Sequence, residues 1–574
     1  MPPTRSLLFA ALRSTLSGGY TLTDLRADVG AAATTAFIAL PLSAGLAIAT
    51  GLPPQYGLYT AVVAGAVAAL AGGARFSVTG PTAAFVVVLG PIVAVHGLGG
   101  LLLATAMAGV ALLGMGLGGL GGLVRLVPTP VVTGFTAGVA VVIATLQLRD
   151  VLGLDVVLPP EGLPEKVLAL ARALPTARWA DLAVAAGTLA VLIGWPRISR
   201  RVPAPLVALL SAAVVCAALS ALYPGFDPIT ITDRYGPVPS GMPHLRWPWE
   251  LPGADGQPLQ ASLELVRQLL PSALTIAVLG ALESLLCAVV ADGMTGDNHD
   301  PDAELVGQGL ANLIAPAFGG FAATGALART AASIRAGARS PIAAALHAGL
   351  LALALLTLAP QLGRLPMAAL AAMLLQVAWH MADAHHVSRM LREAPRSDVA
   401  VLLSCFLLTV VFDMVIAVGF GMGLASLLFM RRMAQISEVR LVTEAAERGG
   451  VELPPDVLHY RVAGPLFFGA SRRAMAALEL LDPSRARGLL LDLSDVPAVD
   501  ATGLANLRSS LERLDRLGVT VVLVGLRSQT LQAVEKTRML EGRLVAADEA
   551  GAVALLAPAG SDGGKRPRGP RKRA

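Results

Sequence analysis

The sequence predicts a polytopic α-helical membrane protein that ends in a soluble α/β domain. Of its 574 residues, 55% are hydrophobic and only 14% are charged, and the mean hydropathy is +0.67. Soluble domains carry about 25% charged residues. Apolar runs close to the roughly 20 residues that cross a bilayer recur between Ala31 and Met430. They recur too often to belong to one soluble core, so we expect a large membrane domain.

The apolar runs divide into about fourteen expected spans, in two sets of about seven. The polar stretch 223–264 separates the two sets. The first set comprises 30–50, 57–73, 80–96, 98–123, 129–149, 179–195 and 203–222. The second comprises 268–291, 303–318, 326–337, 341–360, 364–382, 397–412 and 414–430.

Arginines indicate how the spans are oriented, because cytoplasmic loops are enriched in Lys and Arg. With a cytoplasmic N-terminus, the inside connections hold more arginines than the outside ones, Arg197, Arg389 and Arg431 among them. The acidic loop "DGMTGDNHDPDAE" departs from this trend. An even number of spans returns the C-terminal domain to the cytoplasm. We therefore expect a multi-pass protein of the cell (inner) membrane with both termini cytoplasmic and without a signal peptide.

The composition changes after Met430. Short apolar strands alternate with turns in "VLHYRVAGPLFFGA", "GLLLDLSDVPAVDATGL" and "TVVLVGL", while "ANLRSSLERLDRLG" has helical spacing. We therefore expect four parts, which are a cytoplasmic N-terminal segment 1–29, a transmembrane domain 30–432, a cytoplasmic α/β domain 433–557 and a basic, disordered tail 558–574.

The sequence gives no sign of an enzyme or of a metal site. Cys216, Cys287 and Cys405 lie inside apolar runs without metal-ligand spacing. We find no nucleophile elbow, phosphate-binding loop or zinc signature. The basic tail "GKRPRGPRKRA" is typical of a solubilising or lipid-facing end. We therefore expect no cofactor and no nucleic acid partner.

Two glycine-interrupted segments occupy matching positions in the two sets of spans. "GGARFSVTG", residues 72–80, precedes the third span, and "GGFAATG", residues 319–325, precedes the tenth. Matching interrupted segments predict a transporter site at the bilayer midplane, because irregular backbone at that depth is tolerated only where it is buried in protein or lines a cavity. For one segment alone, packing or a helix kink would explain the glycines. The pairing favours a site.

Helix starts at membrane depth attract anions. The first turn of a helix has free N–H groups and about half a positive charge, so two facing starts form an anion site from backbone alone. Thr79 and Thr82 add hydroxyl groups beside Gly80 and Ala83. Pro81 suits a first turn because it lacks the N–H that would go unused there.

Two ionisable residues inside the expected spans are further candidates. Arg329 follows the second interrupted segment by about one turn and can reach the space between the helix starts. A guanidinium at this depth costs roughly 2.5 to 3.5 kcal/mol on insertion scales, which calls for an anion, a carboxylate or water nearby. The alternative is that Arg329 snorkels to the cytoplasmic face. Glu283 resists ionisation where it is buried, which suits proton uptake during transport. Its alternative role is a fixed salt bridge or hydrogen bond to a neighbouring helix.

Several long motifs resemble the sulfate permease family of anion transporters, solute carrier family 26. They are "GLPPQYGLYTA", "RFSVTGPTAAF", "LGALESLLCAVVADGMTG", "ELVGQGLANLIAPAFGG" and "ARTAASIRAGARSPI". The resemblance implies seven-plus-seven inverted repeats, with segments one to four and eight to eleven forming a core domain and the others a gate domain. It also implies elevator-like transport, a homodimer, and an anion held by the backbone of 80–83 and 328–330, which includes Ala328 and Thr330, with the Arg329 side chain and Glu283.

The substrate is less clear from the same motifs. Within the family, "RFSVTGPTAAFVV", "ESLLCAVVADGMTG" and "FDMVIA" are most similar to a transporter of four-carbon dicarboxylic acids, and Leu42 follows Pro41 where many relatives have Gln. This likeness implies proton-coupled uptake of succinate, fumarate, malate or aspartate. Sulfate or bicarbonate transport coupled to protons or sodium is the alternative, since sulfate is also a dianion. A signalling scaffold would not need so many spans.

The C-terminal domain resembles the STAS module, named for sulfate transporters and anti-sigma factor antagonists. In the antagonists a phosphorylated serine follows an Asp-Ser pair. Here the sequence is "DATG", so Asp500 matches, Ala501 replaces the first serine and Thr502 takes the phosphorylatable place. Thr502 is expected at a helix N-terminus, as a cap or as a regulatory phosphosite. The module also implies protein partners in the cytoplasm.

Overall fold

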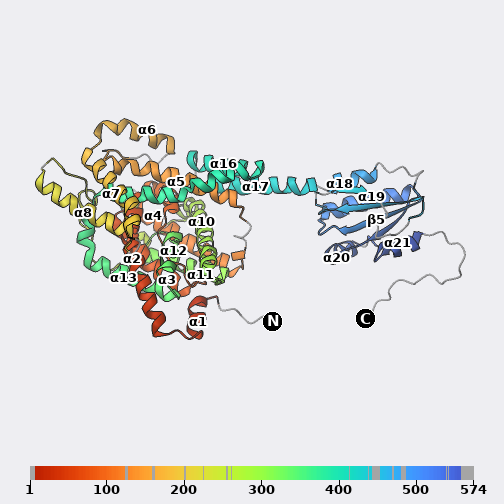
Figure 1. The fold of residues 1–574 in the computed structure, drawn as a ribbon, viewed down its shortest axis with the longest axis horizontal. Helices are drawn as coiled ribbons and strands as arrows, with labels where there is room; N and C mark the ends of the chain where they lie inside the picture. The colour runs from red at the N-terminus through yellow and green to blue at the C-terminus, as the bar shows by residue number, and fades with distance from the viewer. Residues whose placement is uncertain are drawn as a thin grey trace. The chain divides into compact units, whose positions relative to one another are not determined.

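The chain forms two compact units, Met1–Gly423 and Leu424–Ala574, in a computed structural model (Figure 1). The structure is described for residues 7–122, 127–157, 162–199, 202–223, 225–253, 256–259, 262–412, 414–436, 438–442, 453–467, 471–479, 486–537, 539–540 and 542–556. The expected tail 558–574 lies outside this set. Since the division between the units falls within helix α17 (Met414–Ile436), each unit is considered by itself.

The helices of the first unit pack in two groups. One group contains α2 (Leu22–Ala49), α3 (Pro54–Ala71), α4 (Ala83–Leu117), α10 (Leu263–Thr295), α11 (Pro301–Ile314), α12 (Leu327–Arg335) and α13 (Pro341–Gly363). The other contains α5 (Thr129–Val151), α7 (Trp179–Ile198), α8 (Ala204–Leu222), α14 (Met367–Ala382) and α16 (Arg396–Val411). We call these the core group and the gate group, in keeping with the expected arrangement.

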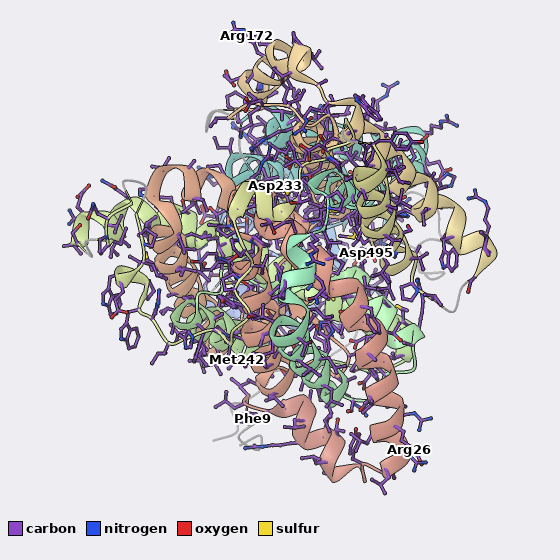
Figure 2. All side chains as sticks on the ribbon, turned by 90° about the vertical axis from the view of Figure 1, so that its left-hand side faces the viewer. Phe9, Arg26, Arg172, Asp233, Met242 and Asp495 are labelled. Carbon is purple, nitrogen blue, oxygen red and sulfur yellow. The ribbon has the colours of Figure 1, made fainter. Side chains whose placement is uncertain are left out.

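Two short helices mark the far sides of these groups. Helix α1 (Ala10–Ser17) packs on α3 and α13 of the core group, and α6 (Leu163–Ala173) packs on α5 and α16 of the gate group. Figure 2 shows Phe9 and Arg26 near α1 well apart from Arg172 on α6. The two groups therefore form two sides of the unit.

The expected spans are found as helices, and two of them are joined into one. Expected spans three and four appear as α4, which is interrupted at Gly97 with φ 67°. This is the left-handed region that glycine enters without a steric penalty. Ten helices of the described residues are long and apolar enough to cross a membrane. Helices α11 and α12 are too short, with 14 and 9 residues, and both adjoin the second interrupted segment.

The second unit contains a sheet of five strands in the order β3 (Glu438–Leu441), β4 (Val457–Ala463), β5 (Gly488–Asp495), β6 (Thr520–Val524) and β7 (Leu544–Ala546). Strand β3 is antiparallel to β4, and the other neighbours are parallel. The helices are α18 (Ser471–Glu479), α19 (Ala501–Arg516), α20 (Ser528–Lys536) and α21 (Glu549–Leu556). The expected α/β domain is therefore present.

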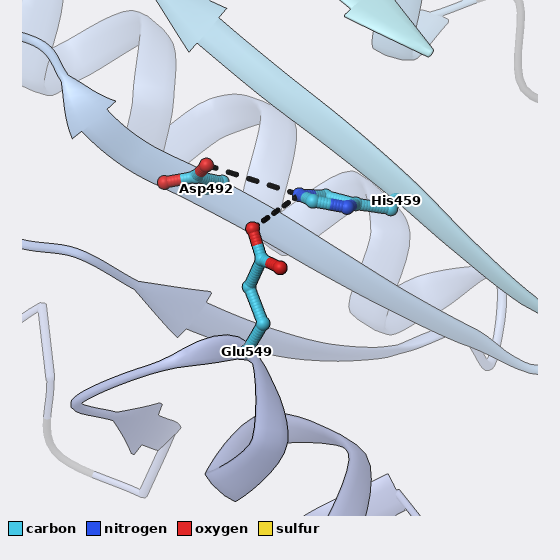
Figure 3. A group of neighbouring side chains, drawn as sticks. All are labelled: His459, Asp492 and Glu549. Atoms are coloured by element: carbon cyan, nitrogen blue, oxygen red, sulfur yellow. Dashed lines mark ion pairs between the residues drawn. The ribbon is translucent and has the colours of Figure 1, made fainter. Parts of the chain in front are cut away.

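Charged residues meet on neighbouring strands of this sheet. His459 of β4 faces Asp492 of β5 and Glu549 of α21, with its Nε2 3.8 Å and 3.9 Å from their oxygens (Figure 3). Arg461 donates to the same two oxygens, at 2.6 Å and 3.1 Å. Burial alone would raise the pKa of Asp492, but the nearby His459 and the hydrogen bonds from Ser494 and Arg461 hold it well below its usual value. Arg461 thus forms ion pairs with both carboxylates.

The start of α19 corrects the expected role of Thr502. The N-cap is Asp500, whose Oδ1 accepts a hydrogen bond from Gly503 N at 2.7 Å. Thr502 lies inside the first turn and is exposed. Thr502 is therefore not the cap, and its phosphorylation stays a prediction.

Candidate anion-binding site

The two interrupted segments meet in the middle of the core group. Strand β1 (Thr79–Gly80) pairs antiparallel with β2 (Thr324–Gly325), Thr79 opposite Gly325 and Gly80 opposite Thr324. Ala326 N also donates to Val78 O at 2.8 Å. Since every buried backbone group needs a partner, each segment satisfies the other where neither is helical.

Glycine is needed on both strands because other atoms approach closely. A Cβ at Gly80 would lie 2.5 Å from Arg329 Nη1, and one at Gly325 would lie 3.1 Å from the Cα of Ser284 and the Cβ of Cys287. At either position a methyl group would force its close-packed neighbours to move. The Thr-Gly pairs recognised in the sequence therefore allow the segments to pack against Arg329 and α10.

Both helices that follow the strands begin without a side-chain cap. Helix α4 begins at Ala83 after Thr82, and α12 begins at Leu327 after Ala326. In neither case does the N-cap side chain accept a hydrogen bond from the first turn, although such caps are common. The free N–H groups and the positive ends of both helix dipoles remain available to an anion. Ala328, in the first turn of α12, is exposed.

Arg329 is buried between the two segments. Only 1% of its surface is exposed, and its Nη2 donates to Pro81 O at 3.1 Å. Within the described residues, Nε and Nη1 have no hydrogen-bond partner. A buried guanidinium with two unused donors is costly. The side chain therefore points into the site instead of snorkelling to the surface.

Glu283 lies beside the start of α4. Its Oε2 accepts a hydrogen bond from Thr82 Oγ1 at 2.9 Å. The hydrogen bond to a neighbouring helix, given above as an alternative role, is thus present. The same contact places a carboxyl group next to the residue that precedes the first free N–H groups of α4. Arg329 and Glu283, both from the second half of the chain, each contact the first half.

The hydroxyl groups of Thr79 and Thr330 are used within the protein. Thr79 Oγ1 accepts from Gln308 Nε2 at 2.7 Å. Thr330 Oγ1 accepts from Val78 N at 2.9 Å and from Cys287 Sγ at 3.2 Å. Both threonines are about 2% exposed, and Ala83 is 7% exposed. Direct anion contact by these three residues stays a prediction, whereas Thr82 is partly exposed.

A row of polar residues on α11 holds the site, and the sequence analysis missed it. Glu304, Gln308 and Asn312 are four residues apart and at most 2% exposed. Residues four apart share one helix face. Polar side chains at this spacing in the short apolar segment "ELVGQGLAN" were the available signal, because such residues are costly in a membrane.

Two residues of this row hold backbone of the interrupted segments, one segment each. Glu304 Oε2 accepts from Gly73 N at 3.1 Å and from Ala74 N at 3.0 Å. Asn312 pairs with Ala323, donating at 2.8 Å and accepting at 2.8 Å. Gln308 lies between them and donates to Glu304 Oε1 at 3.0 Å. One helix thus fixes both interrupted segments.

Glu304→Ala is expected to destabilise the protein, because it leaves Gly73 N and Ala74 N buried without partners. Each unsatisfied group costs about 1 to 3 kcal/mol. The midpoint of thermal aggregation, followed by size-exclusion chromatography of the purified protein, should fall clearly. Glu393→Ala, at the exposed end of α15 (Ala384–Glu393), is the control. An equal change in both variants would contradict this role.

Gly80→Ala is expected to reduce anion uptake strongly while leaving the fold intact. The new Cβ would lie 2.5 Å from Arg329 Nη1, so the flexible guanidinium must move. A displacement of about 1 Å at a reacting or binding group can cost on the order of 100-fold in rate. Uptake into proteoliposomes measures the loss. Gly90→Ala, on α4 with no atom within 4 Å of the added Cβ, should transport normally.

Comparisons with known proteins agree with this architecture. The sulfate permease family matches residues 25–405, and the STAS domain matches residues 450–552. YvdB of Bacillus subtilis, named provisionally as a sulfate transporter, is 37% identical over 90% of this chain and 95% of its own length. The bicarbonate transporter BicA of a Picosynechococcus species is 28% identical over 90% of this chain and 92% of its own.

Solved structures share the fold. The overall structure of SLC26A9 aligns with a TM-score of 0.81 over 95% of this chain and 92% of that one, at 16% identity. The transmembrane domain of cyanobacterial BicA aligns with a TM-score of 0.58 over 71% of this chain and 98% of that one, at 27% identity. The expected likeness to a four-carbon dicarboxylate transporter is not among these findings and stays a prediction. With the family match, the paired segments and the STAS domain together, the chain belongs to the sulfate permease family and is a membrane transporter of anions.

Proposed function

We propose that this protein is a secondary active transporter of a small divalent oxyanion, with sulfate as the first candidate, in symport with a proton. The observation that carries the proposal is the antiparallel pairing of β1 and β2, which joins two uncapped helix starts to buried Arg329. Transport would occur by an elevator-like displacement of the core group against the gate group.

The charges of the site support a dianion. Arg329 contributes one positive charge, and each helix start contributes about half a charge. The total is about +2 when Glu283 is neutral and about +1 when it is ionised. A dianion bound together with a proton on Glu283 is therefore balanced. A monoanion such as bicarbonate would be balanced with Glu283 ionised.

The contact between Glu283 and Thr82 supports coupling of the proton to the anion. Thr82 is the last residue before α4, and its hydroxyl donates to Glu283 at 2.9 Å. A change in the charge of Glu283 therefore acts directly at the helix start that would hold the anion. Like charges repel one another. A deprotonated Glu283 would therefore disfavour a dianion at the start of α4, and a bound dianion would favour protonation of Glu283.

The names of the relatives favour inorganic anions over the dicarboxylates expected from the motifs. YvdB is named provisionally for sulfate and BicA for bicarbonate. A four-carbon dicarboxylate has the same charge as sulfate but is longer. It stays a competing candidate for the substrate. Sodium coupling, the homodimer and the cytoplasmic position of both termini also stay to be tested.

Uptake by the purified protein in proteoliposomes tests the proposal. Labelled sulfate is supplied with an inward proton gradient (acidic outside), with an inward sodium gradient or with neither. In separate samples, excess fumarate, succinate or bicarbonate is added as a competitor. We expect sulfate uptake driven by the pH gradient and unaffected by sodium. Uptake of labelled fumarate that excess sulfate does not inhibit would overturn the choice of sulfate. Uptake that only the sodium gradient drives would overturn the choice of the proton.

A further inference from the structure

An apolar groove lies in the gate group, and none of its lining residues belongs to the paired strands. Helix α14 packs against both α5 and α7, and residues of these three helices line a cavity of about 1340 Å³. Small residues widen it, among them Ala140 and Ala144 of α5 and Ala378 of α14. An apolar groove of this size on a membrane protein is normally covered by hydrocarbon or by another protein.

Basic residues gather at one end of the groove. Arg197 lies in the last turn of α7 and His380 in the last turn of α14, and both line the cavity beside the exposed Trp379. Arg197 Nη1 donates to Ile193 O at 2.6 Å, and its other donors have no partner among the described residues. Tryptophan, arginine and histidine together are typical of the level of lipid headgroups.

A second cavity continues this end of the groove. It has about 540 Å³ and shares Val141 and Ala382 with the first. Helix α15 covers it and contributes Arg392. This helix follows a turn at Asp383 with φ 35° and buries none of its residues. Among the described residues that line the two cavities, the charged or ionisable ones are Arg197, His380 and Arg392, without any carboxylate.

We propose that this groove binds one anionic phospholipid. Its acyl chains would lie over α14 between α5 and α7, and its phosphate would contact Arg197 with support from His380 and Arg392. Hydrocarbon matches the apolar walls, and the charge of the phosphate matches an end that has only basic groups. Basic pockets between membrane helices are known to take anionic headgroups. A zwitterionic lipid would gain the packing of its acyl chains on the apolar walls, but its headgroup has no net negative charge to match the basic end.

Native mass spectrometry of the purified full chain tests the proposal, with phosphatidylglycerol and phosphatidylcholine supplied in equal amounts. We expect the wild type to retain phosphatidylglycerol preferentially. Each arginine near a headgroup contributes about fivefold in affinity, so Arg197→Ala combined with Arg392→Ala should weaken phosphatidylglycerol binding roughly 30-fold. Arg172→Ala, an exposed arginine in the last turn of α6, is the matched control and should change nothing.

A second variant and a salt series keep the test decisive if the double variant does not fold. Ala144→Leu narrows the groove and should reduce the retention of both lipids. Added salt should weaken the binding of phosphatidylglycerol to the wild type and leave the binding of phosphatidylcholine unchanged. Equal retention of both lipids by the wild type would overturn the proposal. So would a dimer that Ala144→Leu dissociates, because the groove would then be covered by a second copy of the chain.

Discussion

Arg329→Ala is expected to abolish anion uptake. The guanidinium is the one full positive charge that the described residues place between the two helix starts, and its Nε and Nη1 are free to donate. A hydrogen bond to a charged group contributes about 1.5 to 3 kcal/mol, so losing two should lower uptake at subsaturating anion by about 100-fold or more. Initial uptake rates in proteoliposomes measure this loss.

A stability measurement separates binding from folding in this variant. Among the described residues Arg329 has one hydrogen-bond partner, Pro81 O, and its burial removes the hydration of a cation. Arg329→Ala also leaves a cavity, so folding is checked with Arg329→Met, whose apolar side chain is closer in volume and should leave stability unchanged or raise it. Arg335→Ala, an exposed arginine on the same helix, should keep both uptake and stability. Normal uptake by Arg329→Ala, or by a folded Arg329→Met, would refute the assigned role.

Glu283→Gln is expected to remove the effect of pH on uptake while retaining anion binding. Glutamine keeps the shape of the neutral carboxyl and can still accept the hydrogen bond from Thr82 Oγ1. It cannot become charged, so the positive site stays at about +2 at every pH. In the wild type, uptake should rise as the external pH falls. In the variant, the rate should be flat, and a pH gradient should no longer drive accumulation.

The control for this variant lies on the same helix. Asp292 of α10 accepts from His299 N at 3.1 Å and takes no part in the contact between Glu283 and Thr82. Asp292→Asn should therefore keep the pH profile of the wild type. Proton-driven accumulation by Glu283→Gln would show that another group carries the proton.

The sequence predicts the spans well because length and apolarity are local properties of the chain. Even the break in α4 falls at Gly97, between the expected third and fourth spans. The matching positions of "GGARFSVTG" and "GGFAATG" in the two sets of spans also predict that the two segments face one another. Their register does not follow from the sequence, because it depends on which atoms fit beside Gly80 and Gly325 once α10 and Arg329 are in place.

The errors and omissions have a common physical origin. Thr502 and Asp500 both have side chains that can cap a helix, and only the geometry of the turn before α19 selects Asp500. The roles of Glu304 and Gln308 depend on long-range contacts. Their partners are more than 220 residues away in the chain, so no local pattern reveals them.

The burial of Arg329 has a consequence for how the site distinguishes anions. With 1% of its surface exposed, the guanidinium gives up its hydration when the protein folds, before any anion arrives. Dehydration of the cation is therefore part of the folding free energy and is the same for every substrate. What differs between one anion and another is the energy needed to strip the anion of its own water. We expect affinity within a series of anions of equal charge to follow their hydration energies, with the most weakly hydrated anion that still spans both helix starts bound best.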